Sequence, residues 1–143
     1  MPYFSRRSKT ALAAAHPLLQ KLFSEVIKEF DCVILESRRG KADQEKAFKS
    51  GNSRAHFGES AHNYTPAIAL DVCPYPINWE NRKAFIEQSK VVLRKAKELG
   101  IPIRWGGDWD GDGDMTDQTL MDLPHYELHP WRTYAKNSKL YRG

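Results

Sequence analysis

The residue types that could bind a metal ion fall in two short segments of the chain. His62 and Asp71 lie in SAHNYTPAIALD, and Asp122 and His125 lie much later in DLPH. Two imidazoles and one carboxylate can hold a catalytic zinc ion, which needs three protein ligands and keeps a fourth position for water. The remaining aspartate, Asp122, is then a candidate general base. Single His and Asp residues in polar segments are commonly surface or capping residues, but two compact groups beside apparent strands favour a metal site.

Asp71 is unusual because it stands inside an apolar run, AIALDVC, over 67–73. Alternation in this run predicts a strand with Ala67, Ala69, Asp71 and Cys73 on one face. An ionised and unpartnered aspartate at such a position would carry a desolvation cost of several kcal/mol. A bound metal ion would offset this cost, and a buried arginine is the alternative.

Hydrophobic periodicity and composition predict three helices that support these side chains. Apolar residues recur at spacings of three and four along the first and the last of them. The expected ranges are 14–30, 41–50 and a long helix that is capped by Asn78 or Asn81 and runs up to Leu99. Gly51 and Gly100 follow the last two helices and are expected to end them.

Short apolar runs predict four strands, over 32–35, 67–73, 101–105 and 123–128. The polar, turn-rich stretch before the second strand places His62 on a loop. The last strand would carry His125 and Glu127 on the same face, so Glu127 could hold the His125 ring in one tautomer. The residues from 129 onward give no pattern that places them.

Length and composition indicate one domain of an ordinary globular protein. The chain has 143 residues, of which 41% are hydrophobic and 28% charged. A net charge of +4 would suit an anionic partner such as nucleic acid or a cell-wall polymer. The basic residues are scattered, however, and form no stripe interleaved with aromatic residues, so we expect no nucleic-acid partner.

We expect neither a secretory signal nor a transmembrane segment. The N-terminal segment has only the short apolar run ALAAA before His16 and Pro17. No apolar run approaches the roughly twenty residues that cross a bilayer. The protein is therefore expected to stay in the cytoplasm until another factor releases it. Cys32 and Cys73 lack the CxxC spacing of zinc sites and lie in apolar runs, so they are expected to be buried free thiols.

An acidic loop provides a second candidate metal site. Asp108, Asp110, Asp112 and Asp114 alternate with other residues in DWDGDGD, as at the start of a calcium-binding EF-hand loop. The match is incomplete, because Thr119 stands where an EF-hand has its glutamate. A calcium loop and a solvated acidic turn both remain open.

Two arginines follow the first predicted strand. From the end of a strand, the guanidinium of Arg38 or Arg39 could reach a cleft and grip a carboxylate or a developing oxyanion with two N–H groups. We expect one of them to be functional and the other to be a surface charge.

These segments together resemble the zinc peptidases of peptidoglycan, which include D-Ala-D-Ala carboxypeptidases and phage L-alanyl-D-glutamate endopeptidases. The resemblance covers nearly the whole chain and rests on FSRRSKTALAAAHPLLQKLF, LESRRGKADQEKAFKSG, SAHNYTPAIALDVCPYPINW and IRWGGDWDGDGDMTDQ leading into DLPHYEL. It implies one α+β domain over 1–143 with the Hedgehog/DD-peptidase fold, in which helices flank a small antiparallel sheet. We expect this domain to be a monomer.

The resemblance also implies roles for individual residues. The zinc ligands of the family correspond to His62, Asp71 and His125, and its catalytic carboxylate corresponds to Asp122. Counting back from the glycine that ends the helix places the transition-state arginine at Arg39, with Arg38 as a further substrate-binding candidate. Ser60 matches the serine of the family's S-x-H pattern and is expected to contact substrate.

Two departures from the commonest family pattern affect these expectations. Many relatives have H-x-x-G-x-A-x-D, whereas here Pro66 and Ala67 replace the glycine step and the interval from His62 to Asp71 is two residues longer. This interval resembles a longer form in one branch of phage and prophage enzymes. Asp122 stands where the carboxypeptidases carry glutamate, as in the endopeptidase branch. The acidic loop resembles a calcium-binding loop of some phage members.

The resemblance implies that zinc-activated water hydrolyses an amide bond in the stem peptide of peptidoglycan. An L-alanyl-D-glutamate endopeptidase of the endolysin type is the main expectation, and a D-Ala-D-Ala carboxypeptidase is the alternative within the enzyme class. A catalytically silent module that binds calcium or cell wall is the alternative outside it. The intact ligands and base argue against such a module.

Overall fold

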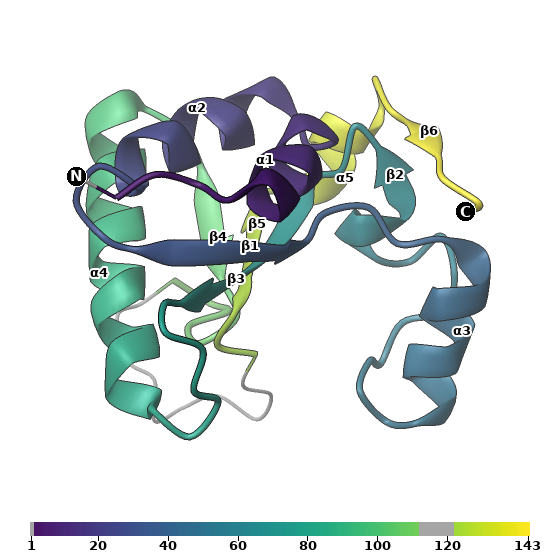
Figure 1. Ribbon diagram of the computed structural model, residues 1–143. Helices are drawn as coiled ribbons and strands as arrows, with labels where there is room; N and C mark the ends of the chain where they lie inside the picture. Colours follow the sequence, from purple (N-terminus) through teal and green to yellow (C-terminus); the bar gives the residue numbers. More distant parts are fainter. Residues whose placement is uncertain (1, 112–121) are drawn as a thin grey trace.

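The computed structural model describes residues 2–111 and 122–143, and it shows helices packed on a small antiparallel sheet (Figure 1). The main sheet is formed by β1 (Cys32–Glu36), β3 (Ala69–Pro74), β5 (His125–Leu128) and β4 (Ile103–Trp105), in that order. Each strand runs antiparallel to its neighbours. The predicted α+β class with a small antiparallel sheet is therefore confirmed.

Alternate residues of the two central strands face opposite sides of the sheet. Leu70 and Val72 of β3 and Tyr126 of β5 are fully buried in the hydrophobic core, where the Tyr126 ring meets the ring of Phe23 edge-on. Because side chains alternate along a strand, the residues between them point to the other face. The register pairs Asp71 with His125 across this other face. The polar residues of interest therefore lie opposite the core.

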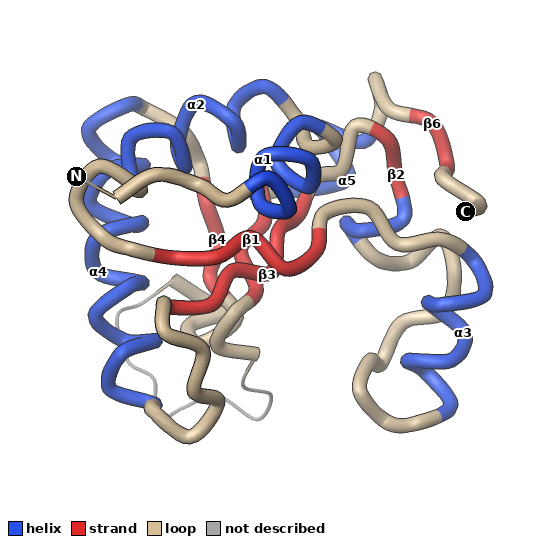
Figure 2. Tube along the Cα trace, in the orientation of Figure 1, coloured by secondary structure: helices blue, strands red, loops and turns tan. Residues whose placement is uncertain are grey.

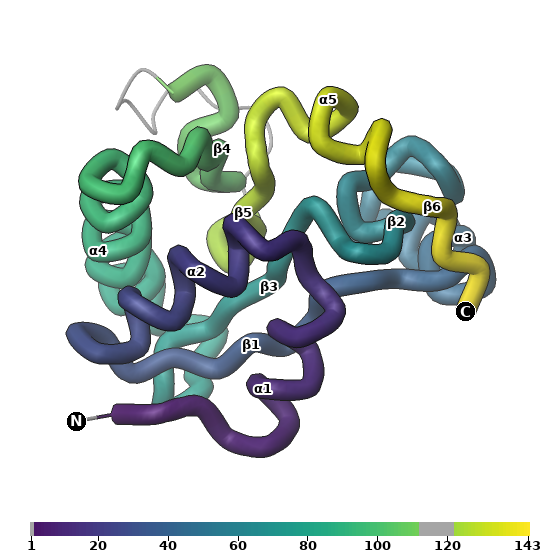
Figure 3. Tube along the Cα trace, turned by 90° about the horizontal axis from the view of Figure 1, so that it is seen from above, coloured from purple at the N-terminus to yellow at the C-terminus, as the bar shows by residue number. Residues whose placement is uncertain are grey.

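Six helical segments surround the sheets in the described part of the chain. They are α1 (Arg6–Ala13), α2 (Pro17–Val26), α3 (Lys41–Lys49), the short 3-10 helix η1 (Ala61–Asn63), α4 (Arg82–Leu99) and α5 (Trp131–Ala135). In the tube drawings, α2 and α4 pack on one side of the main sheet (Figures 2 and 3). α3 stands apart from them, beyond the C-terminal end of β1 (Figure 2).

The bounds of the first predicted helix were wrong. A single helix was expected over 14–30, but the chain forms α1, which was not predicted, and then α2. The break occurs at His16, whose ring Nδ1 accepts the N–H of Leu18 at 3.0 Å and caps the second helix. Pro17 takes the first helical position, where a missing N–H costs nothing. Residues 27–30 form turns beyond the helix.

The other two predicted helices are confirmed. α3 begins at Lys41, and Gly51 follows its last turn with a φ of 80°. The side chain of Asn81 caps α4, and Gly100 ends it with a φ of 69°. Positive φ is the left-handed region that glycine adopts without strain, which explains why these helices stop where the glycines stand.

A C-terminal strap, which we define as residues 138–143, crosses the end of the molecule that carries α3. Its strand β6 (Lys139–Leu140) pairs antiparallel with β2 (Tyr64–Thr65). The N–H of Tyr141 donates to the carbonyl of Asn63 at 2.8 Å, and the N–H of Lys41 donates to the carbonyl of Arg142 at 3.1 Å. Figure 3 shows the strap running over this region. The strap therefore joins η1 to the start of α3.

Two further sequence expectations concern burial and membranes. Cys32 and Cys73 are buried free thiols, as predicted. Burial raises the pKa of the Cys32 thiol to about 12, so it stays protonated at neutral pH. Among the described residues, no helix is both long and apolar enough to cross a bilayer.

Deleting residues 138–143 should loosen η1 and α3 while leaving the main sheet intact. We expect the free energy of unfolding to fall by about 2 kcal/mol, since each intramolecular hydrogen bond contributes about 1 kcal/mol net. Thermal unfolding and amide hydrogen exchange measure this. Amides of β3 and β5 serve as the internal control, and unchanged exchange in η1 and α3 would show that the strap does not hold them.

Candidate metal centre

Three ligand-type side chains from separate elements meet on the open face of the sheet. His62 comes from η1, Asp71 from β3 and His125 from β5. The Nε2 atom of His62 lies 3.2 Å from Asp71 Oδ1 and 3.2 Å from His125 Nδ1. The third separation, from His125 Nδ1 to Asp71 Oδ1, is 3.5 Å. The structure therefore brings the three predicted ligands together despite the lengthened interval between the first two.

This arrangement matches the size of a tetrahedral zinc site. Bonds of about 2.0–2.1 Å in tetrahedral geometry place neighbouring ligand atoms about 3.3 Å apart. The three measured separations lie close to this value. Two imidazoles and a carboxylate are also a normal donor set for zinc. The residues present therefore fit a zinc ion with one position left for another ligand.

Each histidine has its second ring nitrogen bound to an acceptor, which fixes its tautomer. His62 Nδ1 lies 2.6 Å from the carbonyl oxygen of Ser37, so Nδ1 donates and Nε2 turns its lone pair to the cluster. His125 Nε2 lies 2.7 Å from Glu127 Oε1, which leaves Nδ1 free for a metal. Glu127 in turn accepts a hydrogen bond from Arg104 at 2.7 Å. The contact expected between Glu127 and His125 is thus present.

The charges around His125 favour a cation at the centre. Burial lowers the pKa of His125, but the carboxylates of Asp71 and Glu127 outweigh this effect and raise it to about 10. Burial raises the pKa of Asp71, but the two histidines outweigh this effect and hold it below its ordinary range. A bound metal ion would compensate the negative charge of these carboxylates in place of a proton, with both imidazoles neutral.

Asp122 lies in the turn that leads into β5. Its N–H donates to the carbonyl of Gly106 at 2.9 Å, and its own carbonyl accepts the N–H of His125 at 3.1 Å. Burial raises the pKa of the Asp122 carboxyl; the charge of His125 opposes this rise and that of Asp71 adds to it. Its carboxyl therefore lies within electrostatic reach of the cluster.

Gly106 allows Asp122 to approach so closely. A Cβ atom at Gly106 would lie 2.1 Å from the carbonyl oxygen of Asp122, which no side chain could tolerate without a backbone shift. The N–H of Gly106 also donates to the carbonyl of His125 at 2.8 Å. This glycine therefore keeps Asp122 and His125 in register.

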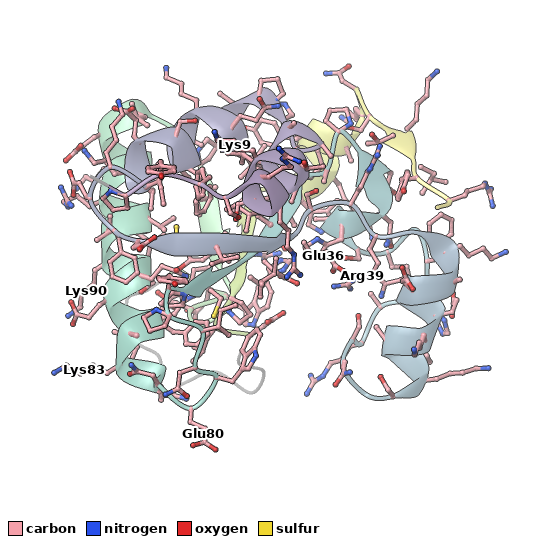
Figure 4. The ribbon with its side chains drawn as sticks, in the orientation of Figure 1. Lys9, Glu36, Arg39, Glu80, Lys83 and Lys90 are labelled. Atoms are coloured by element: carbon pink, nitrogen blue, oxygen red, sulfur yellow. The ribbon has the colours of Figure 1, made fainter. Side chains whose placement is uncertain are left out.

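The Arg39 guanidinium faces the cluster from the end of β1. Its Nη2 lies 3.6 Å from Asp71 Oδ2, and its Nε donates to Glu36 Oε1 at 2.7 Å. Figure 4 shows Glu36 and Arg39 side by side at the end of β1 that faces α3. Asp71 therefore lies beside an arginine, which was the alternative partner that its sequence position suggested, and within a cluster that could hold the other, a metal ion. A guanidinium held here could stabilise an oxyanion beside the metal.

Arg38 and Ser60 contact other residues of the chain. Arg38 is exposed; its guanidinium lies 4.4 Å from the centre of the Tyr141 ring and 3.5 Å from Thr65 Oγ1, on the strap and β2. Ser60 caps η1, because its Oγ accepts the N–H of His62 at 3.2 Å. Binding of substrate by either residue stays a prediction.

The predicted calcium loop lies partly outside the described residues. Asp112 and Asp114 fall within 112–121, which the structure does not describe. Asp108 is buried and donates its N–H to the carbonyl of Trp105 at 3.0 Å, and Asp110 is exposed. Calcium binding therefore stays a prediction.

The sequence analysis missed two buried amides beside the site, Gln44 of α3 and Asn63 of η1. Both are fully buried, and Gln44 Oε1 accepts a hydrogen bond from Arg39 Nη1 at 3.1 Å. Gln44 stands in the charged segment KADQEKAFKS, which resembles a solvated helix. Its only signal in the sequence was its place one turn into a helix that follows Arg39.

Comparison with known proteins identifies the family. A model described as phage L-alanyl-D-glutamate peptidase matches residues 1–129. The chain belongs to this family. It is 30% identical over 133 residues to the L-alanyl-D-glutamate peptidase of Escherichia phage T5, covering 87% of this chain and 96% of that protein. The family predicted from the sequence motifs is therefore confirmed.

A solved structure shows the same fold. The L-Ala D-Glu endopeptidase ChiX of Serratia marcescens superposes with a TM-score of 0.75 at 27% sequence identity. The match covers 93% of this chain and 94% of that one. The same fold therefore extends over nearly the whole of this chain.

Removing the Glu127 carboxylate should weaken metal binding without removing a ligand. In Glu127→Ala we expect metal affinity to fall about 10–100-fold, because the His125 ring loses the acceptor that orients it. His125→Ala should abolish binding. Titration with zinc against a competing chelator measures both. Glu87→Ala, on the exposed face of α4, is the control, and wild-type affinity in Glu127→Ala would contradict the assigned contact.

Proposed function

We propose that this chain is a zinc-dependent peptidase that hydrolyses the L-alanyl-D-glutamate bond of the peptidoglycan stem peptide. The observation that carries the proposal is the convergence of His62, Asp71 and His125 with Arg39 and the carboxyl of Asp122 around one point. Family membership supports the choice of bond. The zinc assignment rests on the donor set and on the three separations of 3.2, 3.2 and 3.5 Å.

When bound, the zinc would supply the Lewis acidity that makes a water molecule nucleophilic at neutral pH. Asp122 would accept the proton of that water and deliver it to the leaving amine. Burial raises the pKa of the Asp122 carboxyl, and the positive charge of a bound zinc ion would lower it. Arg39 would stabilise the negative charge that develops on the carbonyl oxygen, an effect worth about 3 kcal/mol in barrier.

Mass spectrometry of digested peptidoglycan tests the reaction and its alternatives. Release of peptides that begin at D-glutamate supports the proposed endopeptidase. Loss of a single alanine would instead indicate a D-Ala-D-Ala carboxypeptidase, and no product would indicate a silent wall-binding module. Chelator-treated protein with and without added zinc, cobalt or calcium identifies the metal. The monomeric state, the lack of a nucleic-acid partner and retention in the cytoplasm stay predictions.

Replacing the base should separate metal binding from catalysis. In Asp122→Ala we expect zinc to be retained while kcat falls about 10²–10⁴-fold, the usual contribution of a general acid and base. Asp71→Ala should lose zinc and hydrolysis together. Elemental analysis beside a lysis assay distinguishes the two variants, and a fully active Asp122→Ala protein would rule out the base.

Replacing the arginine should slow turnover with the metal in place. In Arg39→Ala we expect kcat to fall about 10²-fold, as when a donor to an oxyanion is removed. Arg94→Ala, at an exposed ion pair with Glu29, is the control for loss of a surface charge. If Arg39→Ala kept its rate and Arg38→Ala lost it, the role would move to Arg38.

A further inference from the structure

Two buried amides form a polar bridge between the metal-ligand turn and α3. Asn63 immediately follows His62 in η1, and Gln44 lies in the first turns of α3. Both side chains are fully buried, and Asn63 Nδ2 donates to Gln44 Oε1 at 3.0 Å. Neither residue belongs to the ligand set or offers a base.

The orientation of the Gln44 amide is determined by its partners. Its Nε2 donates to the carbonyl of Ala55 at 2.7 Å and to Ser53 Oγ at 3.0 Å. Because a carbonyl only accepts, the nitrogen must be on that side and the oxygen must face the other way. There Oε1 accepts from Arg39 Nη1 at 3.1 Å and from Asn63. Gln44 Oε1 is therefore a hydrogen-bond acceptor with a fixed position beside the Arg39 guanidinium.

The side chain of Asn63 binds the backbone of Arg39. Its Nδ2 also donates to the carbonyl of Arg39 at 3.2 Å, and the N–H of Arg39 donates to the carbonyl of His62 at 2.6 Å. Asn63 Oδ1 accepts hydrogen bonds from the N–H groups of Gly58 and Ser60 at 2.9 and 3.1 Å. The backbone of Arg39 and the turn that carries the first metal ligand are thus one hydrogen-bonded unit.

We propose that Gln44 and Asn63 are positioning residues that hold the Arg39 guanidinium at a set place relative to His62. The inference rests on the oxyanion role of Arg39 in the proposed function. An arginine side chain has many rotamers and loses this freedom when it is ordered, so an unheld Arg39 guanidinium would occupy many orientations. Glu36 and Asp71 alone would draw its N–H groups to themselves. The hydrogen bond from Arg39 Nη1 to Gln44 Oε1 gives the guanidinium a third fixed contact.

A second buried glutamine offers a matched control. Gln88 of α4 is also fully buried, and its Nε2 donates to the carbonyl of Val72 at 3.1 Å and lies 3.5 Å from the Tyr126 hydroxyl, on the core face of the sheet. Replacing either glutamine by methionine keeps similar volume and removes a buried amide. Gln88 Oε1 has no hydrogen-bond partner among the described residues, so Gln88→Met should lose less stability than Gln44→Met. Gln88→Met therefore controls for the loss of a buried amide that does not contact Arg39.

A double-mutant cycle between Gln44 and Arg39 tests the proposal. In Gln44→Met we expect kcat on an L-alanyl-D-glutamyl stem peptide to fall at least about tenfold, since the charged guanidinium of Arg39 loses a hydrogen-bond acceptor. KM and zinc affinity should stay near wild type, as should kcat in Gln88→Met. In the Arg39→Ala background the same change should lower kcat no further, because residues that act through one another are not additive. A full additive loss would overturn the proposal.

Gln44→Glu provides a rescue, because it keeps an Oε atom facing Arg39 while it loses the Nε2 donors. We expect kcat to recover towards wild type although the melting temperature stays lowered. A rate as low as that of Gln44→Met would overturn the positioning role. If Gln44→Met does not fold, Asn63→Asp takes its place in the cycle with the same expectations, since it keeps the Oδ1 bonds of the turn and loses the Nδ2 donors.

The outcome for wild-type protein separates this inference from the proposed function. A wild-type chain that binds zinc but does not cleave the stem peptide would overturn the proposed function, and the inference with it. An active wild-type chain whose Gln44→Met variant keeps its kcat would overturn only the positioning role.

Discussion

The pairing of Asp71 with His125 across β3 and β5 is the constraint on which the site depends. Side chains alternate along a strand, so a one-residue shift in the register of β3 would turn Asp71 into the hydrophobic core and bring Leu70 to the open face. The same shift in β5 would exchange His125 and Tyr126. The core therefore selects the register, since Leu70, Val72 and Tyr126 are all fully buried. Apolar packing on one face of the sheet in this way places two candidate metal ligands, Asp71 and His125, on the other face.

The rest of the site comes from outside the sheet and is attached by polar contacts. His62 reaches the cluster from a short turn, which is held by Ser60, by the carbonyl of Ser37 and by the C-terminal strap. Arg39 is tied to that turn through its backbone and through Gln44. The site thus combines a rigid sheet face with a hydrogen-bonded unit. In that unit the positions of the arginine and of the first ligand depend on each other.

The sequence motifs predicted the ligand set, the family and the alternation of β3, because metal ligands and apolar periodicity leave local patterns. They did not predict α1, the helical turn at His62 or the strap. Gln44 was missed for a physical reason. A buried amide differs from a solvated one only in its partners, and those partners, Arg39, Asn63, Ser53 and Ala55, are spread along the chain. Helical composition around Gln44 indicated a surface position.

The sequence by itself determined which chemistry is available: two imidazoles, two carboxylates and an arginine in segments of one peptidase family. Residue type fixes the donor atoms, and these do not depend on the fold. Only the tertiary structure decided which ring nitrogen of each histidine meets the cluster. Only it decided that the Arg39 guanidinium lies beside Asp71 while Arg38 contacts Tyr141, and that Arg104 joins the pair of Glu127 and His125. Hydrogen-bond partners from distant elements make these choices, because they form only when the chain has folded.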